Sequence, residues 1–155
     1  MTKIDHSKIQ KGVYVRKVDS VPKESPLTHS KVVVFVTTYD IRICAPYTDV
    51  PMSVSAAHTI EHIILNLLES SSWWSRVIYF GLQANMTGFS LIMKGLPDYD
   101  VVRLVRDAFG TLLTCDHIPN RSKEDCSNWE QHNLLEAKAF VKDFVESEWW
   151  DSYPR

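Results

Sequence analysis

Two histidines, His58 and His62, stand four residues apart in a segment whose apolar residues follow helical spacing. These apolar residues recur every three or four positions, as in a helix with one buried face; they are Ala57, Ile60, Ile64, Leu67 and Leu68. Ser53 or Ser55 can cap the start of this helix. Both imidazoles would then lie on one face, within reach of a single metal ion. The segment therefore predicts a metal-binding helix.

Glu61 completes an inverted His-x-x-Glu-His motif. Its carboxylate would lie on the same turn as the two rings, where it can act as a general base rather than as a ligand. Histidines at this spacing also occur as half-buried, hydrogen-bonded residues of ordinary helices, so a metal requires a third ligand. Cys126 can supply it, because it lies in a polar stretch at a predicted helix start that favours a thiolate. Cys44 and Cys115 have apolar neighbours and are expected in the core.

The rest of the chain predicts an α+β fold in one domain, residues 1–155, built as an antiparallel sheet packed against helices. Alternating and β-branched stretches predict strands at 13–18, 31–44, 73–82 and 87–95, the last two joined by a short connection that suits antiparallel pairing. Two further helices are predicted, from Asp98 or Asp100 to about residue 113 and from about 128 to 148. The tail 148–155 is expected to be partly disordered.

Charge and hydropathy exclude several classes of partner. The chain has 17 Lys and Arg against 19 Asp and Glu, so it carries no electrostatic footprint for nucleic acid or an anionic membrane. Its apolar runs are shorter than the ~20 residues that span a bilayer, and no apolar signal core follows the N-terminus. The three cysteines match no disulfide framework. We expect a cytoplasmic protein that binds a small polar ligand or a protein partner.

Inverted zinc peptidases use the same motif, with the glutamate activating water and a distant glutamate completing the site. Glu130 and Glu136 are available for that role. Those peptidases build a substrate chamber from much longer chains, whereas 155 residues are too few to enclose a peptide between two halves. An inverted-motif zinc peptidase is therefore a minor alternative.

From about residue 4 to residue 145 the chain resembles S-ribosylhomocysteine lyase, the LuxS family that makes the autoinducer precursor of quorum sensing. Four stretches carry the resemblance: Ile-Asp-His-Ser-Lys at 4–8 with Tyr-Val-Arg at 14–16; Tyr-Asp-Ile-Arg-Ile-Cys at 39–44 followed by Pro46; His-Thr-Ile-Glu-His at 58–62; and Cys126 with His132, Leu134 and Ala137. They occur in the family's order and spacing. Together these motifs are specific for the family.

The resemblance implies a LuxS-like α+β homodimer with active sites at the subunit interface. It further implies one divalent transition metal per chain, ferrous iron first and zinc or cobalt as substitutes, and a ribosyl thioether substrate that releases homocysteine after two enolisations. Carried over by position, the metal ligands are His58, His62 and Cys126. Glu61 would transfer protons. Arg42 and His6 would contact the substrate.

One loop departs from the family pattern. Family members have Gly-Cys-Arg-Thr-Gly or Gly-Cys-Gln-Thr-Gly there, and the cysteine is the second acid/base group. This chain has Ala-Asn-Met-Thr-Gly at 84–88, so Asn85 stands at the position of the catalytic cysteine. An amide does not titrate near neutrality, and losing a general acid/base group typically costs ~10²- to 10⁴-fold in rate. Two hypotheses follow: a lyase with altered chemistry or substrate, and a non-catalytic metal- and ligand-binding member.

Overall fold

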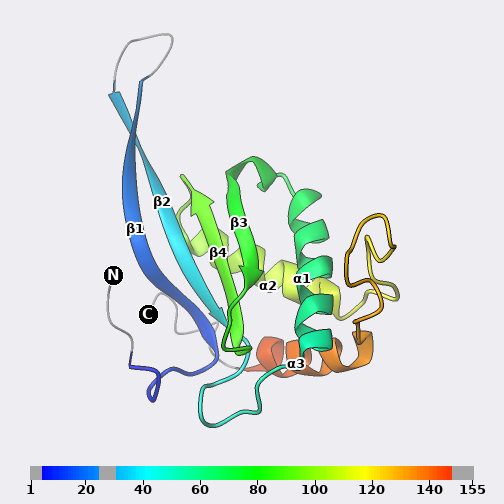
Figure 1. Ribbon diagram of the computed structural model, residues 1–155. Helices are drawn as coiled ribbons and strands as arrows, with labels where there is room; N and C mark the ends of the chain where they lie inside the picture. Colours follow the sequence, from blue (N-terminus) through cyan, green and yellow to red (C-terminus); the bar gives the residue numbers. More distant parts are fainter. Residues whose placement is uncertain (1–4, 25–30, 148–155) are drawn as a thin grey trace.

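Four antiparallel strands form one sheet in the order β1-β2-β4-β3, as the computed structural model in Figure 1 shows. The structure describes residues 5–24 and 31–147, and the predicted disorder of 148–155 lies outside them. The strands are β1 (Gly12–Glu24), β2 (Lys31–Arg42), β3 (Val77–Leu82) and β4 (Gly88–Lys94). The helices are α1 (Val54–Glu69), α2 (Asp98–Leu112) and α3 (Leu134–Glu146), with a short 3-10 turn, η1 (Trp74–Arg76), before β3. The predicted α+β fold is confirmed.

The first strand is longer than its sequence pattern predicts. β1 continues through Pro22, which pairs with Val33 of β2. Proline lacks a backbone N–H, so it is tolerated in an edge strand, where the N–H on the outer side has no neighbouring strand to pair with. β1 is the edge strand of the sheet, so the prediction that the strand stops at residue 18 is wrong.

Helix α1 begins where the sequence predicts. The Ser53 side chain accepts a hydrogen bond from the backbone N–H of Ala56 (3.1 Å), which satisfies one of the free donors of the first turn. The buried face of α1 contains Ala56, Ala57, Thr59, Ile60, Ile63, Ile64 and Leu68. The helix packs against β3, α2 and α3. Burial of this face turns the histidines and Glu61 away from the core.

Helix α3 starts later than predicted. It begins at Leu134 because the side chain of Asn133 caps it, accepting from the N–H of Glu136 (3.0 Å). The residues just before this cap form turns instead of a helix. Cys126 therefore lies in the connection between α2 and α3, and its predicted place at a helix start is wrong.

The core lies between the sheet and the three helices. Phe80 and Phe89 stack with ring centroids 5.2 Å apart, and Phe109 meets Phe144 edge-on at 5.3 Å. Cys44 lies in this core, and burial raises the pKa of its thiol to about 11, so it is not a thiolate near neutrality. Among the described residues, no helix is both long enough and apolar enough to cross a membrane.

Candidate metal centre

Four side chains bring donor atoms together beside α1. His58 and His62 come from the helix, while Cys126 and His132 come from the connection between α2 and α3. One ligand atom from each of the four lies within 4.8 Å of the others, and the Cys126 Sγ is 3.4 Å from the His58 Nε2. Such convergence of nitrogen and sulfur donors is the arrangement that binds a transition metal.

Backbone carbonyls orient the two helix histidines. The Nδ1 of His58 lies 3.0 Å from the carbonyl oxygen of Gln131, and the Nδ1 of His62 lies 3.1 Å from that of Pro119. A carbonyl oxygen only accepts, so each Nδ1 carries the proton and donates it. Each Nε2 is left with a lone pair for a cation, which is the usual outer-sphere arrangement around a ligating histidine.

The ring of His132 is oriented in the same way by a hydroxyl. The Thr59 Oγ1 donates its one proton to the carbonyl of Ser55 (2.7 Å) and lies 3.2 Å from the His132 Nδ1. The Nδ1 of His132 must therefore donate to the Thr59 hydroxyl, which leaves the free lone pair of the ring on Nε2. This Nε2 is buried and has no hydrogen-bond partner among the described residues. Burial, with His58 and His62 adding to it, lowers the pKa of His132 to about 4. The ring is neutral near pH 7 and can donate that lone pair.

The donor set fits a divalent transition metal. Neutral imidazoles and a thiolate suit zinc, ferrous iron or cobalt about equally. From the sequence, His58, His62 and Cys126 were predicted as ligands. His132 appeared there only as part of a motif shared with the family. Its place six residues after Cys126, in a polar stretch, was the available signal.

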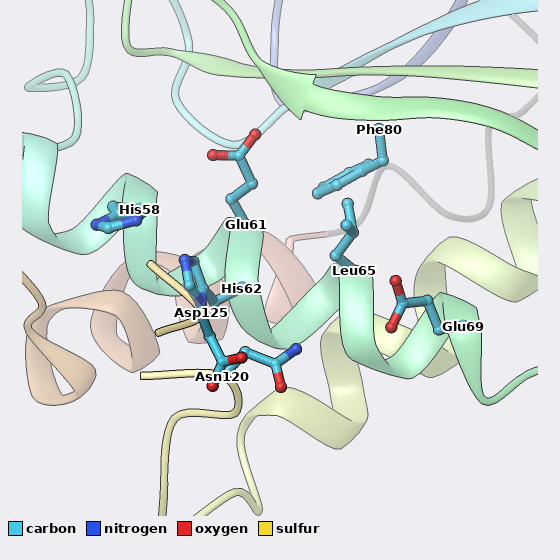
Figure 2. Close-up of a pocket in the computed structure, with 8 residues that line it drawn as sticks. All are labelled: His58, Glu61, His62, Leu65, Glu69, Phe80, Asn120 and Asp125. Atoms are coloured by element: carbon cyan, nitrogen blue, oxygen red, sulfur yellow. The ribbon is translucent and has the colours of Figure 1, made fainter. Parts of the chain in front are cut away.

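A cavity of about 320 Å³ opens beside the cluster (Figure 2). His58, Glu61 and His62 line one part of it. Further along the helix, Leu65 of α1 faces Phe80 of β3. The Glu61 carboxylate is directed toward the end of β3, where its Oε1 accepts from the N–H of Leu82 (3.3 Å). The structure thus places a carboxylate, a cavity and the metal donors side by side.

Asn85 lies at the exposed tip of the turn between β3 and β4. Its Oδ1 accepts two hydrogen bonds from Thr87, one from the backbone N–H (3.1 Å) and one from the hydroxyl (2.8 Å). Asn85 is not among the described residues that line the cavity beside the cluster. Its side chain is engaged within its own turn.

Arg42 is the last residue of β2 and is only 2% exposed. Its Nε lies 2.8 Å from the Asp40 Oδ1, and its Nη2 donates to the Asp40 Oδ2 (2.9 Å). Its Nη1 donates to the hydroxyl of Thr87. The guanidinium is therefore held inside the protein by named partners, and its contact with a substrate stays a prediction.

His6 is exposed in a turn at residues 5–8. The segment before β1 lies at the β1 side of the sheet, while α1 lies at the other side (Figure 1). His6 is not among the described residues of the donor cluster or of the cavity beside it. Its contact with the substrate stays a prediction.

Comparison with known proteins adds an independent finding. The family model described as S-ribosylhomocysteinase (LuxS) matches residues 2–152. The chain is similar to the S-ribosylhomocysteine lyase of Borreliella burgdorferi strain ZS7, at 38% identity over 140 residues, covering 87% of this chain and 82% of that protein. It is also similar to the S-ribosylhomocysteine lyases of Phocaeicola vulgatus (33% identity, covering 87% and 80%) and Finegoldia magna (32% identity, covering 92% and 86%). The matched residues include all four donors of the cluster.

Proposed function

Because this chain belongs to the S-ribosylhomocysteinase (LuxS) family, we propose that it is a metal-dependent carbon–sulfur lyase that releases homocysteine from a ribosyl thioether. The resemblance predicted from the sequence is confirmed by the family match. The observation that carries the proposal is the convergence of His58, His62, Cys126 and His132 beside a cavity that also contains Glu61. The relatives are S-ribosylhomocysteine lyases by name.

His58, His62 and Cys126 would hold one divalent metal per chain, with Fe²⁺ as the first choice and Zn²⁺ or Co²⁺ as substitutes. When bound, such an ion supplies Lewis-acid polarisation of a sugar oxygen, which acidifies the neighbouring C–H bond. The Nδ1 hydrogen bonds to Gln131 and Pro119 support this role, because they hold both rings with Nε2 toward the other donors.

Glu61 would move the protons. In the bond-breaking step its carboxylate takes a proton from carbon, a double bond forms in the sugar chain, and homocysteine leaves as the thiolate. The hydrogen bond from Leu82 N–H holds one carboxylate oxygen of Glu61 beside the cavity. Asn85 cannot share this work by titrating, so we assign the proton transfers to Glu61.

We further propose a cytoplasmic homodimer with the site at its interface, in which Arg42 and His6 contact the substrate, and no nucleic-acid or membrane partner. Exposed apolar side chains on one face of the β1–β2 ribbon support a dimer, because patches of this kind mark interaction surfaces; they are Val18, Val33 and Phe35, while the exposed Val21 and Val32 lie on the opposite face. The absence of His6 from the described donor cluster and from the lining of the cavity also favours a site shared between two copies.

The test uses the full chain, purified without chelators and loaded with Fe²⁺ or Co²⁺. It is incubated with S-ribosylhomocysteine, and the released thiol is measured. We expect sustained homocysteine release that Glu61→Gln abolishes and that Glu146→Gln, an exposed glutamate on α3, leaves unchanged. Release no higher than that of Glu61→Gln contradicts the lyase.

A non-catalytic metal- and ligand-binding protein is the second candidate, favoured by the position of Asn85 outside the cavity lining. It predicts that the metal-loaded chain binds S-ribosylhomocysteine without turnover. Calorimetric titration on the same preparation separates this outcome from the lyase. The peptidase alternative predicts cleavage of unstructured peptides that Glu61→Gln removes. Neither Glu130 nor Glu136 is in the donor group found among the described residues.

A further inference from the structure

A network of charged and polar side chains is buried at the end of β2. Asp40 and Arg42 alternate with Tyr39 and Ile41, so they point to the opposite face of the sheet from these core residues. Asp40 is 1% exposed. The Arg42 guanidinium contacts both of its carboxylate oxygens, with Nε 2.8 Å from Oδ1 and Nη2 2.9 Å from Oδ2. Arg16 of β1 adds a second guanidinium, with its Nε 3.6 Å from the Asp40 Oδ2. Charges this deep must be paired to be tolerated.

The turn between β3 and β4 is attached to this network at both of its ends. At the first end, the Nε2 of Gln83 donates to the Asp40 Oδ1 (2.8 Å). At the second end, the hydroxyl of Thr87 accepts from Arg42, and the Thr87 carbonyl accepts from the N–H groups of Ile43 and Cys44 (3.0 Å each). The turn and the end of β2 are therefore one connected unit.

The donors and acceptors of Arg42, Thr87 and Asn85 allow only one direction for the hydrogen bonds between them. Arg42 can only donate, so the Thr87 hydroxyl accepts from it and must direct its single proton elsewhere. That proton goes to the Oδ1 of Asn85 (2.8 Å). The same oxygen accepts from the backbone N–H of Thr87 (3.1 Å), which closes an Asx turn. The chain of bonds runs from Arg42 through Thr87 to Asn85.

We propose that Asn85 is a positioning residue that holds the Arg42 guanidinium in place through the Thr87 hydroxyl. Asn85 accepts the Thr87 proton and so leaves the hydroxyl lone pairs aimed at Arg42. A methyl group at residue 85 cannot accept this proton, and a thiol accepts it only weakly. A carboxylate can accept both bonds in the same geometry, so aspartate is the conservative replacement.

The consequence for activity rests on the proposed function, in which Arg42 contacts the substrate. A residue that positions Arg42 affects substrate binding, whereas a residue that transfers protons affects the chemical step. Loss of Asn85 is therefore expected to raise KM more than it lowers kcat. This split separates a positioning residue from a weakened acid/base group.

Hydrogen exchange of the Arg42 guanidinium protons tests the proposal without any turnover. The Arg42 signals are assigned by NMR with Arg42→Lys, and exchange is compared in the folded wild type, Asn85→Ala and Asn85→Asp. We expect Asn85→Ala to speed exchange about tenfold, the worth of one hydrogen bond, and Asn85→Asp to restore the wild-type rate. Asn128→Ala, which removes an exposed asparagine outside the network, is the matched control and should leave the rate unchanged.

Three outcomes overturn the proposal. The first is exchange in Asn85→Ala at the wild-type rate, the second is exchange in Asn85→Asp as fast as in Asn85→Ala, and the third comes from a double variant. The double variant Asn85→Ala/Thr87→Val should exchange no faster than Thr87→Val alone, because both changes break the same chain, and additive effects contradict it. If wild type releases no homocysteine, the proposed function fails, and the exchange measurement still decides the role of Asn85.

Discussion

Each histidine of the cluster is oriented by a contact on the side away from the other donors. Two of these contacts are backbone carbonyls and the third is the hydroxyl of Thr59. Such outer contacts select the tautomer and hold the ring before a metal arrives, which reduces the reorganisation that binding requires. The donors of the cluster are therefore largely preorganised.

Cys126→Ser should remove stoichiometric metal from the protein. The change replaces a soft thiolate by a neutral hydroxyl, and the loss of affinity should exceed the ~10- to 100-fold that loss of an outer contact costs. Elemental analysis of protein purified without chelators measures this. The matched control is Cys115→Ser, which changes a half-buried cysteine outside the cluster and should keep one metal per chain. One metal per chain in Cys126→Ser would contradict the assignment.

The buried carboxylate of Asp40 should matter for stability as well as for position. Asp40→Asn leaves Arg42 and Arg16 without their shared anion, and breaking a buried pair in this way costs about 3–5 kcal/mol. Urea unfolding measures the difference. Asp19→Asn removes a carboxylate that is 51% exposed and pairs with Lys17, so its effect should be within about 1 kcal/mol. Equal losses for the two variants would show that Asp40 is not anchoring the network.

At the scale of elements, the pairing of β2 with β4 depends on a glycine. Gly88 faces Arg42 in the register, and a Cβ there would lie 2.1 Å from the carbonyl oxygen of Ile41. This backbone atom cannot move without disturbing the ladder. The close approach also brings Thr87, next in the chain, to the end of β2.

Two glycine substitutions should have opposite effects on stability. Gly88→Ala forces the two strands apart. It should destabilise the fold by about 3 kcal/mol or more, above the usual range of about 1–3 kcal/mol for overpacking. Gly110→Ala lies in α2 with open space around its Cβ and should stabilise by about 0.5–1 kcal/mol. Thermal unfolding of both variants gives the comparison. A Gly88→Ala protein as stable as wild type would rule out the close approach.

The start of α1 also belongs to this scale. Ser53 caps the helix and donates to the Glu136 Oε2 of α3 (2.8 Å), so one side chain joins the two helices that flank the metal donors. The α3 helix begins at Leu134, two residues after His132, so this contact lies close in sequence to one donor of the cluster.

At the scale of the whole molecule, the exposed apolar side chains of β1 and β2 predict self-association. Phe35 is 56% exposed and lies in β2, one residue before Val36, which pairs with Lys94 at the end of β4. Phe35→Glu should shift a dimer to a species of 17.9 kDa without unfolding it, because burying a charge at an apolar interface is costly. Analytical ultracentrifugation measures this. Tyr99→Glu, at a 72% exposed residue on α2, is the control and should remain dimeric; a monomeric wild type would refute the prediction.

Much of the architecture could be predicted, because each helix and strand is encoded by contiguous residues. The spacing of Ile60, Ile64 and Leu68 predicted α1, and the β-branched residues before Tyr39 predicted β2. Boundaries were predicted less well where a neighbouring strand or a cap decided them. Pro22 continues β1 because β1 is at the edge of the sheet, and Asn133 starts α3 later than the sequence pattern indicates.

The sequence by itself determined that two imidazoles and a carboxylate share one face of a helix, because helical geometry places residues three and four apart together. It also singled out Cys126, through its polar neighbours. Only the tertiary structure decided that His132 turns its lone pair inward, through a hydroxyl 73 residues away, and that Arg42 is tied to Thr87, 45 residues away. Such contacts depend on how distant segments pack, and no local pattern encodes them.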